Sequence, residues 1–141
     1  MLDHIGFKVS DYERSQAFYL RALEPLGHGL VMEVTPEMTG TDSRHAGFGS
    51  DRKPSFWIGW VKAGTGDTTR GSLHIALAAK DRAAVDAFHA AALAAGGTDN
   101  GAPGLSPQYH PNYYGAFVRD AYGHKIGYLI LAQRLVMPEV I

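Results

Sequence analysis

Two histidines, His4 and His74, are the residues of this chain best suited to chemistry, because each precedes a short apolar stretch. An imidazole can coordinate a metal ion, act as a general base near neutral pH, or simply hydrogen-bond within a fold. In "HIGFKV", apolar residues alternate with His4, Gly6 and Lys8. This alternation predicts a half-buried strand with His4 on the face opposite to the aliphatic residues.

The stretch that begins at His4 occurs again seventy residues later. Residues 4–27 read "HIGFKVSDYERSQAFYLRALEPLG" and residues 74–97 read "HIALAAKDRAAVDAFHAAALAAGG". At this offset the identical pairs are His4/His74, Ile5/Ile75, Asp11/Asp81, Phe18/Phe88, Ala22/Ala92, Leu23/Leu93 and Gly27/Gly97. They fall on a strand, a helix start, a helix face and a helix stop in the same order, which predicts a duplicated unit.

Each copy carries the signals of an amphipathic helix. Asp11 or Ser10 begins the first and Asp81 the second, while Gly27 and Gly96 or Gly97 end them. The residues expected to pack are Phe18, Ala22, Leu23 and Leu26 in the first helix and Val85, Phe88, Ala92 and Leu93 in the second. The helices would then cover the aliphatic strand faces and leave His4 and His74 on the uncovered faces.

Further strands are predicted after each helix. The first half offers "GLVMEVT", "HAGFG" and "SFWIGWVK", and the second offers "YYGAFVR" and "KIGYLIL" around the turn "DAYG". The Gly- and Pro-rich segment "GGTDNGAPGLSPQYHPN" predicts a long loop with room for one short strand. We therefore expect one α+β domain of paired βαβββ units, whose curled mixed sheet forms a cavity with the helices outside. Its parts are unit 1 (1–62), a linker (63–71), unit 2 (72–131) and a C-terminal tail (132–141).

Composition narrows the function classes. The 141 residues are 45% hydrophobic and 19% charged, and the apolar runs are far shorter than the roughly 20 residues of a bilayer helix. Thirteen basic and fourteen acidic residues give a net charge of −1, so neither nucleic acid nor a membrane is an expected partner. Cysteine is absent and no secretory signal is visible, so we expect a cytoplasmic location.

The quoted segments together resemble the vicinal oxygen chelate superfamily over nearly the whole chain. The segments that carry the resemblance are "LDHIGFKVSDYERSQAFYLRALEPLG", "SLHIALAAKDRAAVDAFHAAAL" and "YYGAFVRDAYGHKIGYLIL". The superfamily includes glyoxalase I, bleomycin-resistance proteins, fosfomycin-resistance transferases and extradiol dioxygenases. The resemblance implies a small-molecule ligand or substrate, and often a homodimer, but not one reaction.

The resemblance also implies a metal site whose ligands lie on the first and last strands of each unit. The first-strand positions are His4 and His74. The last-strand positions are Gly127, where the family usually has a glutamate, and Gly59, where it often has another ligand. Two imidazoles without a carboxylate leave the charge of the ion uncompensated. Residues that could complete the set are His45, His110, His124, Glu33, Glu37 and Tyr109. We expect no stoichiometric metal, although zinc, manganese, iron or nickel would suit this kind of site.

A second group of residues suits a pocket for a small organic molecule. If Gly59 faces the cavity then Trp57 does too, and glycine at 59 and 127 would leave open space beside the indole. Tyr109, His110 and Tyr113 precede a cavity strand, where they could line the pocket or pack at a loop base.

Three functions therefore remain open. The first is a metal-dependent lyase, isomerase or dioxygenase with an unidentified third ligand. The second is a metal-free enzyme in which His4 or His74 is the general base. The third is a protein that sequesters a drug or metabolite, as bleomycin-resistance proteins do.

Overall fold

A computed structural model describes residues 1–62, 64–65 and 73–120, together with the backbone of 126–130. The first half contains β1 (Ile5–Val9), α1 (Tyr12–Leu23), the 3-10 turn η1 (Glu24–Leu26), β2 (Gly29–Val34), α2 (Pro36–Thr39), β3 (His45–Ser50) and β4 (Lys53–Trp60). The second half contains β5 (Ile75–Ala78), α3 (Arg82–Ala94), β6 (Thr98–Leu105), β7 (Tyr114–Arg119) and β8 (Ile126–Ile130).

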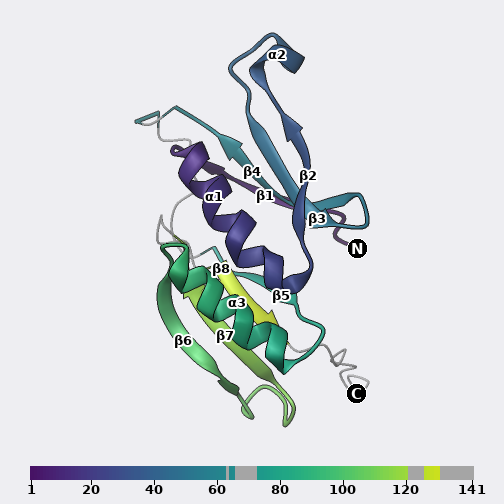
Figure 1. The fold of residues 1–141 in the computed structure, drawn as a ribbon, viewed down its shortest axis with the longest axis vertical. Coiled ribbons are helices and arrows are strands. Elements are labelled where there is room, and N and C mark those ends of the chain that lie inside the picture. The colour runs from purple at the N-terminus through teal and green to yellow at the C-terminus, as the bar shows by residue number, and fades with distance from the viewer. Residues whose placement is uncertain (63, 66–72, 121–125, 131–141) are drawn as a thin grey trace.

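The two halves share one strand topology. In the first half the strands form a sheet in the order β1-β4-β3-β2, with β1 parallel to β4. In the second, β5 is parallel to β8, β8 lies beside β7, and β7 pairs with β6. Figure 1 shows α1 and α3 on the same side of the strands, one over each half. The predicted α+β architecture of paired βαβββ units is confirmed.

The helix signals of the sequence are mostly confirmed. The carboxylates of Asp11 and Asp81 each accept a backbone N–H of the first helical turn, from Arg14 and Ala84. Gly27 and Gly96 adopt positive φ angles of 76° and 102°, which favour glycine at helix ends.

The prediction that Leu93 packs on the buried face of α3 is wrong. Leu93 is 36% exposed, because the buried face of α3 passes through Ala84, Val85, Phe88 and Ala92. The residue next to Ala92 on a helix is rotated by roughly 100° away from that face.

The core lies between the helices and the sheets and is rich in aromatic side chains. Phe18 and Phe88 are each 2% exposed, as predicted. The ring of Tyr19 lies 4.9 Å from those of Phe18 and Phe56, and its hydroxyl donates a hydrogen bond of 2.6 Å to Oδ2 of Asp120. Burial and the neighbouring carboxylate raise the pKa of Tyr19 well above its ordinary value. Asp120, which the sequence predicts only as the first residue of a turn, is buried and links the second half to α1. The rest of that predicted turn, residues 121–125, lies outside the described residues.

Residues 98–105 form a strand of eight residues, more than the one short strand for which the predicted loop left room. β6 pairs antiparallel with β7, and the register shifts between Asp99 and Gly101 and again between Gly101 and Gly104. Among the described strands only β7 pairs with β6, so Pro103 lies in an edge strand, where a missing backbone N–H is tolerated. The Gly and Pro content that predicted a loop therefore marks bulges in an edge strand.

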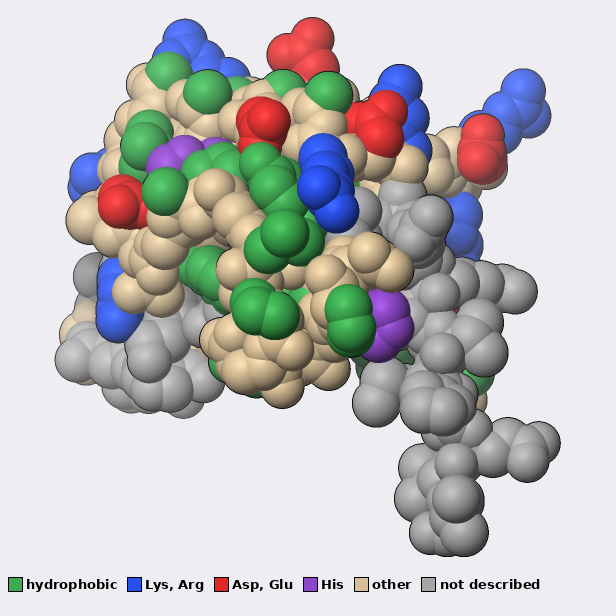
Figure 2. Space-filling view, turned by 90° about the horizontal axis from the view of Figure 1, so that it is seen from below, with side chains coloured by type: hydrophobic (Ala, Val, Ile, Leu, Met, Phe, Trp, Pro, Cys, Tyr) green, Lys and Arg blue, Asp and Glu red, His purple; other side chains and the backbone are tan. Residues whose placement is uncertain are grey.

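No described helix is long and apolar enough to cross a bilayer. On the face seen in Figure 2, basic and acidic side chains are interspersed, and the described residues show no continuous basic surface there.

Replacing Phe18 or Phe88 by alanine should lower the free energy of unfolding by about 3–5 kcal/mol, because each leaves a cavity in the core. Leu93→Ala, on the exposed side of α3, is the matched control and should cost less than about 1 kcal/mol. Urea denaturation followed by circular dichroism measures all three. Equal losses for Phe88→Ala and Leu93→Ala would contradict the assigned helix face.

Candidate functional site

The face of the first sheet that points away from α1 contains a pocket. Phe7 and Val9 are buried beneath the helices, so the alternate residues Gly6 and Lys8 lie on the other face of β1. A pocket of about 350 Å³ on this side is lined by His4, Gly6, Phe7, Lys8, Val34, His45, Trp57 and Gly59. This volume is within the usual range for small-molecule sites, which is roughly 300–1,000 Å³.

Gly59 is at the centre of this face, with a strand on either side. Its cross-strand partners are Lys8 on β1 and His45 on β3. A Cβ atom at position 59 would lie 2.8 Å from Cδ2 of His45 and 3.0 Å from Nζ of Lys8. Gly59 lines the pocket together with Trp57, but the place that a side chain at position 59 would take is filled by Lys8 and His45.

Lys8 and His45 form a polar pair in the pocket. Nζ of Lys8 lies 3.4 Å from Nε2 of His45, so the ammonium is the donor and the imidazole nitrogen the acceptor. Burial lowers the pKa of His45, and the positive charge of Lys8 lowers it further. The pair therefore presents one positive charge and one neutral imidazole to a ligand near pH 7.

The sequence predicts His45 only as a candidate metal ligand, and Lys8 is not among the predicted site residues. The alternation in "HIGFKV" already places Lys8 on the face of His4. The pairing of β3 with β4, which brings His45 over Gly59, leaves no comparable signal along the chain.

Trp57 provides the apolar wall. It lies on the same face of β4 as Gly59, as the alternation predicted, and it lines the pocket. A Cβ at Gly47 would come within 2.8 Å of the Trp57 ring, so the indole passes closely over a position without a side chain. Glycine at position 47 therefore leaves the room that the indole occupies.

His4 also lines a second pocket, of about 320 Å³, together with His74. Its lining is Leu2, Asp3, His4, Ile5, Ser55, Phe56, His74, Ile75, Ala76 and Leu77. The structure therefore brings the two predicted histidines to one pocket between the first strands of the two halves.

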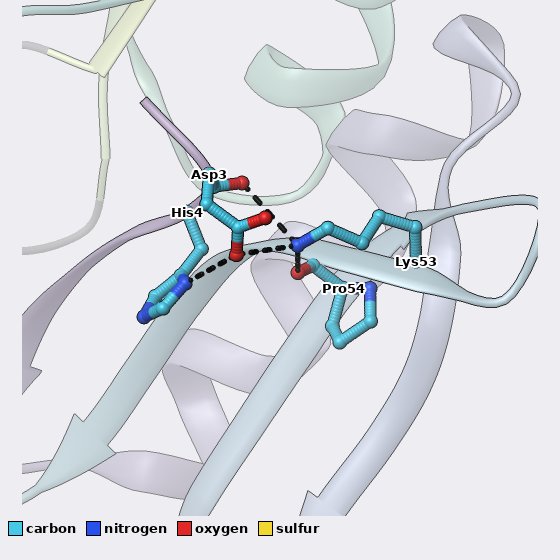
Figure 3. Close-up of polar contacts among 4 residues, drawn as sticks. All are labelled: Asp3, His4, Lys53 and Pro54. Carbon is cyan, nitrogen blue, oxygen red and sulfur yellow. Dashed lines mark hydrogen bonds and ion pairs between the residues drawn. The ribbon is translucent and has the colours of Figure 1, made fainter. Parts of the chain in front are cut away.

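His4 is oriented by Asp3. Nδ1 of His4 lies 2.8 Å from Oδ1 of Asp3, which also accepts a hydrogen bond of 2.8 Å from Nζ of Lys53 (Figure 3). These hydrogen bonds, that of His4 first, lower the pKa of Asp3. An ionised Asp3 favours the tautomer in which Nδ1 of His4 carries the proton and Nε2 is the acceptor.

The two halves differ in strand register. His4 and His74 precede equivalent strands, β1 and β5, each parallel to the last strand of its half. Gly59 pairs with Lys8, whereas Gly127 falls at a bulge between the pairs Ile75–Ile126 and Ala76–Tyr128. The expectation that Gly59 and Gly127 are structural equivalents is therefore wrong, because the shared "IG" letters stand at different positions of the parallel register.

The segment containing Tyr109, His110 and Tyr113 lines neither of these two pockets. Tyr109 is 62% exposed, and its ring lies 5.0 Å from that of the buried Tyr113. Nδ1 of His110 accepts the backbone N–H of Asn112. A role of this segment in substrate binding stays a prediction.

Among the described residues, the remaining ligand candidates do not complete a metal site. Glu33 accepts hydrogen bonds from Tyr12 and Gln16 on α1, Glu37 belongs to α2, and His124 lies outside the described residues. Nowhere in the described part of the chain do three His, Asp or Glu side chains gather as a metal site requires. Because a catalytic zinc needs three protein ligands, the described residues do not fit such an ion.

Sequence comparison assigns the family. A profile of the glyoxalase/bleomycin resistance protein/dioxygenase superfamily matches residues 1–128. The chain belongs to this superfamily. No protein of curated function matches the sequence.

Solved structures of this superfamily share the fold. A glyoxalase/bleomycin resistance protein from Albidiferax ferrireducens T118 is 29% identical, with a TM-score of 0.67 over 92% of this chain and 96% of the other. A glyoxylase/bleomycin resistance protein/dioxygenase domain from Frankia sp. EAN1pec is 17% identical, with a TM-score of 0.68 over 95% and 93%. A variant of glyoxalase I from Zea mays is 22% identical with a TM-score of 0.66, and this chain, matched over 92%, covers 46% of its length.

The imidazole of His45 should titrate below its ordinary pKa of 6.5, because burial and Lys8 both disfavour the charged form. As the pH falls, the unfolded chain takes up a proton on this imidazole before the folded chain does. The contribution of neutral His45 to the free energy of unfolding is therefore present above pH 6.5 and is lost as the pH falls through the lowered pKa. An NMR titration of the imidazole protons measures this pKa. Lys8→Met should raise it only in part, and a wild-type pKa at or above 6.5 would contradict the assignment.

Protein purified without added metal should carry far less than one transition-metal ion per chain. The reason is that the described residues bring no third His, Asp or Glu ligand into position with His4 and His74, and the carboxylate of Asp3 is already bound by His4 and Lys53. Elemental analysis of the purified protein measures the metal content. Stoichiometric metal that is lost in His4→Ala would overturn this expectation and require a third ligand.

Proposed function

We propose that this protein binds a small organic molecule in the pocket on the open face of its first sheet, without a bound metal ion. The observation that carries the proposal is the combination in one pocket of the Trp57 indole with the polar pair Lys8 and His45. Binding sites for small molecules typically combine an apolar wall with a few placed polar groups.

The wall and the polar pair define what such a ligand needs. The indole offers a flat face that suits an aromatic or other planar group. Lys8 and His45, which meet above Gly59, can then orient the polar end of the molecule. The superfamily and the similarity to a glyoxalase/bleomycin resistance protein from Albidiferax ferrireducens T118 support a small-molecule ligand.

Sequestration of a drug or metabolite is the form of this function that needs the fewest additional groups. It requires the pocket and nothing else, whereas a metal-dependent lyase or dioxygenase requires a third ligand that the described residues do not bring to His4 and His74. Asp3 is the carboxylate nearest to the two imidazoles, but its Oδ1 is already bound by His4 and Lys53. This arrangement favours a binder or a metal-free enzyme.

A metal-free enzyme is the second candidate, favoured by the contact between Asp3 and His4. Nδ1 of His4 donates a hydrogen bond to Oδ1 of Asp3 over 2.8 Å, which leaves Nε2 of His4 as a base beside both pockets. Such a base could remove a proton from a carbon next to a carbonyl group. Turnover of a bound ligand that is lost in His4→Gln, with its binding retained, would favour the enzyme over the binder.

The homodimer and the cytoplasmic location stay predictions. Light scattering coupled to gel filtration measures the first, and a mass of one chain at micromolar concentration would contradict it. Fractionation of the producing cells tests the second.

Ligand binding should change the fluorescence of Trp57, because the indole lines the pocket. The matched variants are Trp57→Phe, which should abolish the change, and Trp60→Phe, which should preserve it since Trp60 lines neither pocket that contains His4. A screen of small aromatic compounds by tryptophan emission makes the measurement. A response that survives Trp57→Phe and disappears with Trp60→Phe would place the ligand elsewhere.

A further inference from the structure

We propose that the ligand is an elongated molecule with two apolar parts, which lie in the two pockets beside His4 and are joined by a hydrogen-bond donor that binds Nε2 of His4. This inference rests on the proposed function and specifies the shape and chemical class of the ligand. It extends the site from the pocket that contains Trp57 to the second pocket, between the first strands of the two halves.

The two pockets lie side by side. Of the described residues, His4 alone lines both of them. On β4 the alternate residues Ser55 and Trp57 share the open face of the sheet, and Ser55 lines the second pocket while Trp57 lines the first. Two residues of a strand span roughly 7 Å, so a linker of a few bonds can join groups in the two pockets. One molecule can therefore reach from the first pocket to the second past the ring of His4.

The ring of His4 presents a hydrogen-bond acceptor where the pockets meet. Its Nδ1 is bound to Oδ1 of Asp3 over 2.8 Å, and that oxygen also accepts a hydrogen bond from Nζ of Lys53 (Figure 3). The described residues offer no hydrogen-bond partner to Nε2, on the far side of the ring. A ring nitrogen that carries no proton accepts a hydrogen bond. An N–H or O–H group between the two parts of the ligand would provide one.

The second pocket suits an apolar group. Its volume of about 320 Å³ is close to the 350 Å³ of the first. Asp3, the acidic residue of its described lining, is already bound by His4 and Lys53. A methylene group that moves from water into an apolar lining gains about fourfold in affinity. The apolar residues of this lining are Leu2, Ile5, Phe56, Ile75, Ala76 and Leu77.

The test compares N-methylbenzamide with N-butylbenzamide, which share an aromatic ring and an amide N–H and differ in the length of the alkyl chain. Binding is followed by Trp57 emission and by calorimetry on the full-length protein. N-butylbenzamide should bind at least about tenfold more tightly, a ratio that corresponds to about 1.4 kcal/mol, because its chain enters the second pocket. In labelled wild-type protein it should also shift the amides of Ile75 and Ala76, which N-methylbenzamide should leave in place.

A matched pair of variants assigns the gain in affinity to the second pocket. Ala76→Phe places a ring in this pocket, so it should abolish the gain from the longer chain and leave the binding of N-methylbenzamide unchanged. Ala78→Phe introduces the same ring at the next alternate position of β5, which is also exposed but lines neither pocket, and should preserve the gain. If Ala76→Phe fails to fold, the amide shifts of the wild-type protein decide the question.

A second probe tests the hydrogen bond to His4. Butyl benzoate has the ring and the chain of N-butylbenzamide but an ester oxygen in place of the N–H group. His4→Phe keeps a ring at position 4 and removes the acceptor. It should therefore lower the ratio of amide affinity to ester affinity by about fivefold, which is typical of one hydrogen bond. Ala78→Phe should leave this ratio unchanged.

Three results would overturn this inference and leave the proposed function standing. They are an equal gain from the longer chain in Ala76→Phe and Ala78→Phe, wild-type amides of Ile75 and Ala76 that N-butylbenzamide does not shift, and a ratio of amide to ester affinity that His4→Phe leaves unchanged. Failure of every aromatic probe to change Trp57 emission would instead contradict the proposed function itself.

Discussion

The missing side chain at Gly59 is the constraint on which the chemistry of the first sheet depends. Strands β1 and β3 flank β4, so the residues beside Gly59 must share whatever space it leaves. Lys8 and His45 fill that space and meet 3.4 Å apart. A side chain at position 59 would meet both of them, so the close approach of these two strands' side chains depends on glycine there.

The two halves have the same topology but do not have the same chemistry. Their helices pack on one side of the sheets, and the hydrogen bond from Tyr19 to the buried Asp120 joins α1 to the end of β7. Replacing Asp120 would remove this acceptor from the buried hydroxyl of Tyr19, which is costly. The duplication therefore accounts for the shared strand topology and for the two histidines. The polar pair Lys8 and His45 and the indole of Trp57, which lie on β4 and its neighbours, belong to the first half.

The fold could be predicted because its signals are local. The helix caps at Asp11 and Asp81 and the repeat of seventy residues need only the chain order. Segment 98–105 forms a longer strand than the predicted short one, because Gly and Pro occur in edge strands with bulges as well as in loops.

The site could be predicted only in part. The alternation of each strand places His4 and Trp57 on the open face, which the pocket lining confirms. The meeting of Lys8 with His45 depends on which strands pair and in what register, and 37 positions separate the two in sequence. The same dependence made Gly59 and Gly127 look equivalent when their registers differ.

Mapping of a bound ligand by amide NMR shifts tests the central claim most directly, namely that the open face of the first sheet is the ligand site. Titration of the labelled protein with a small aromatic compound that changes Trp57 emission should shift the amides of Gly6, Lys8, Gly47 and Gly59, which lie on β1, β3 and β4 around Trp57. The amides of β6 should stay in place. Shifts confined to the second half, with these four amides unmoved, would contradict the account.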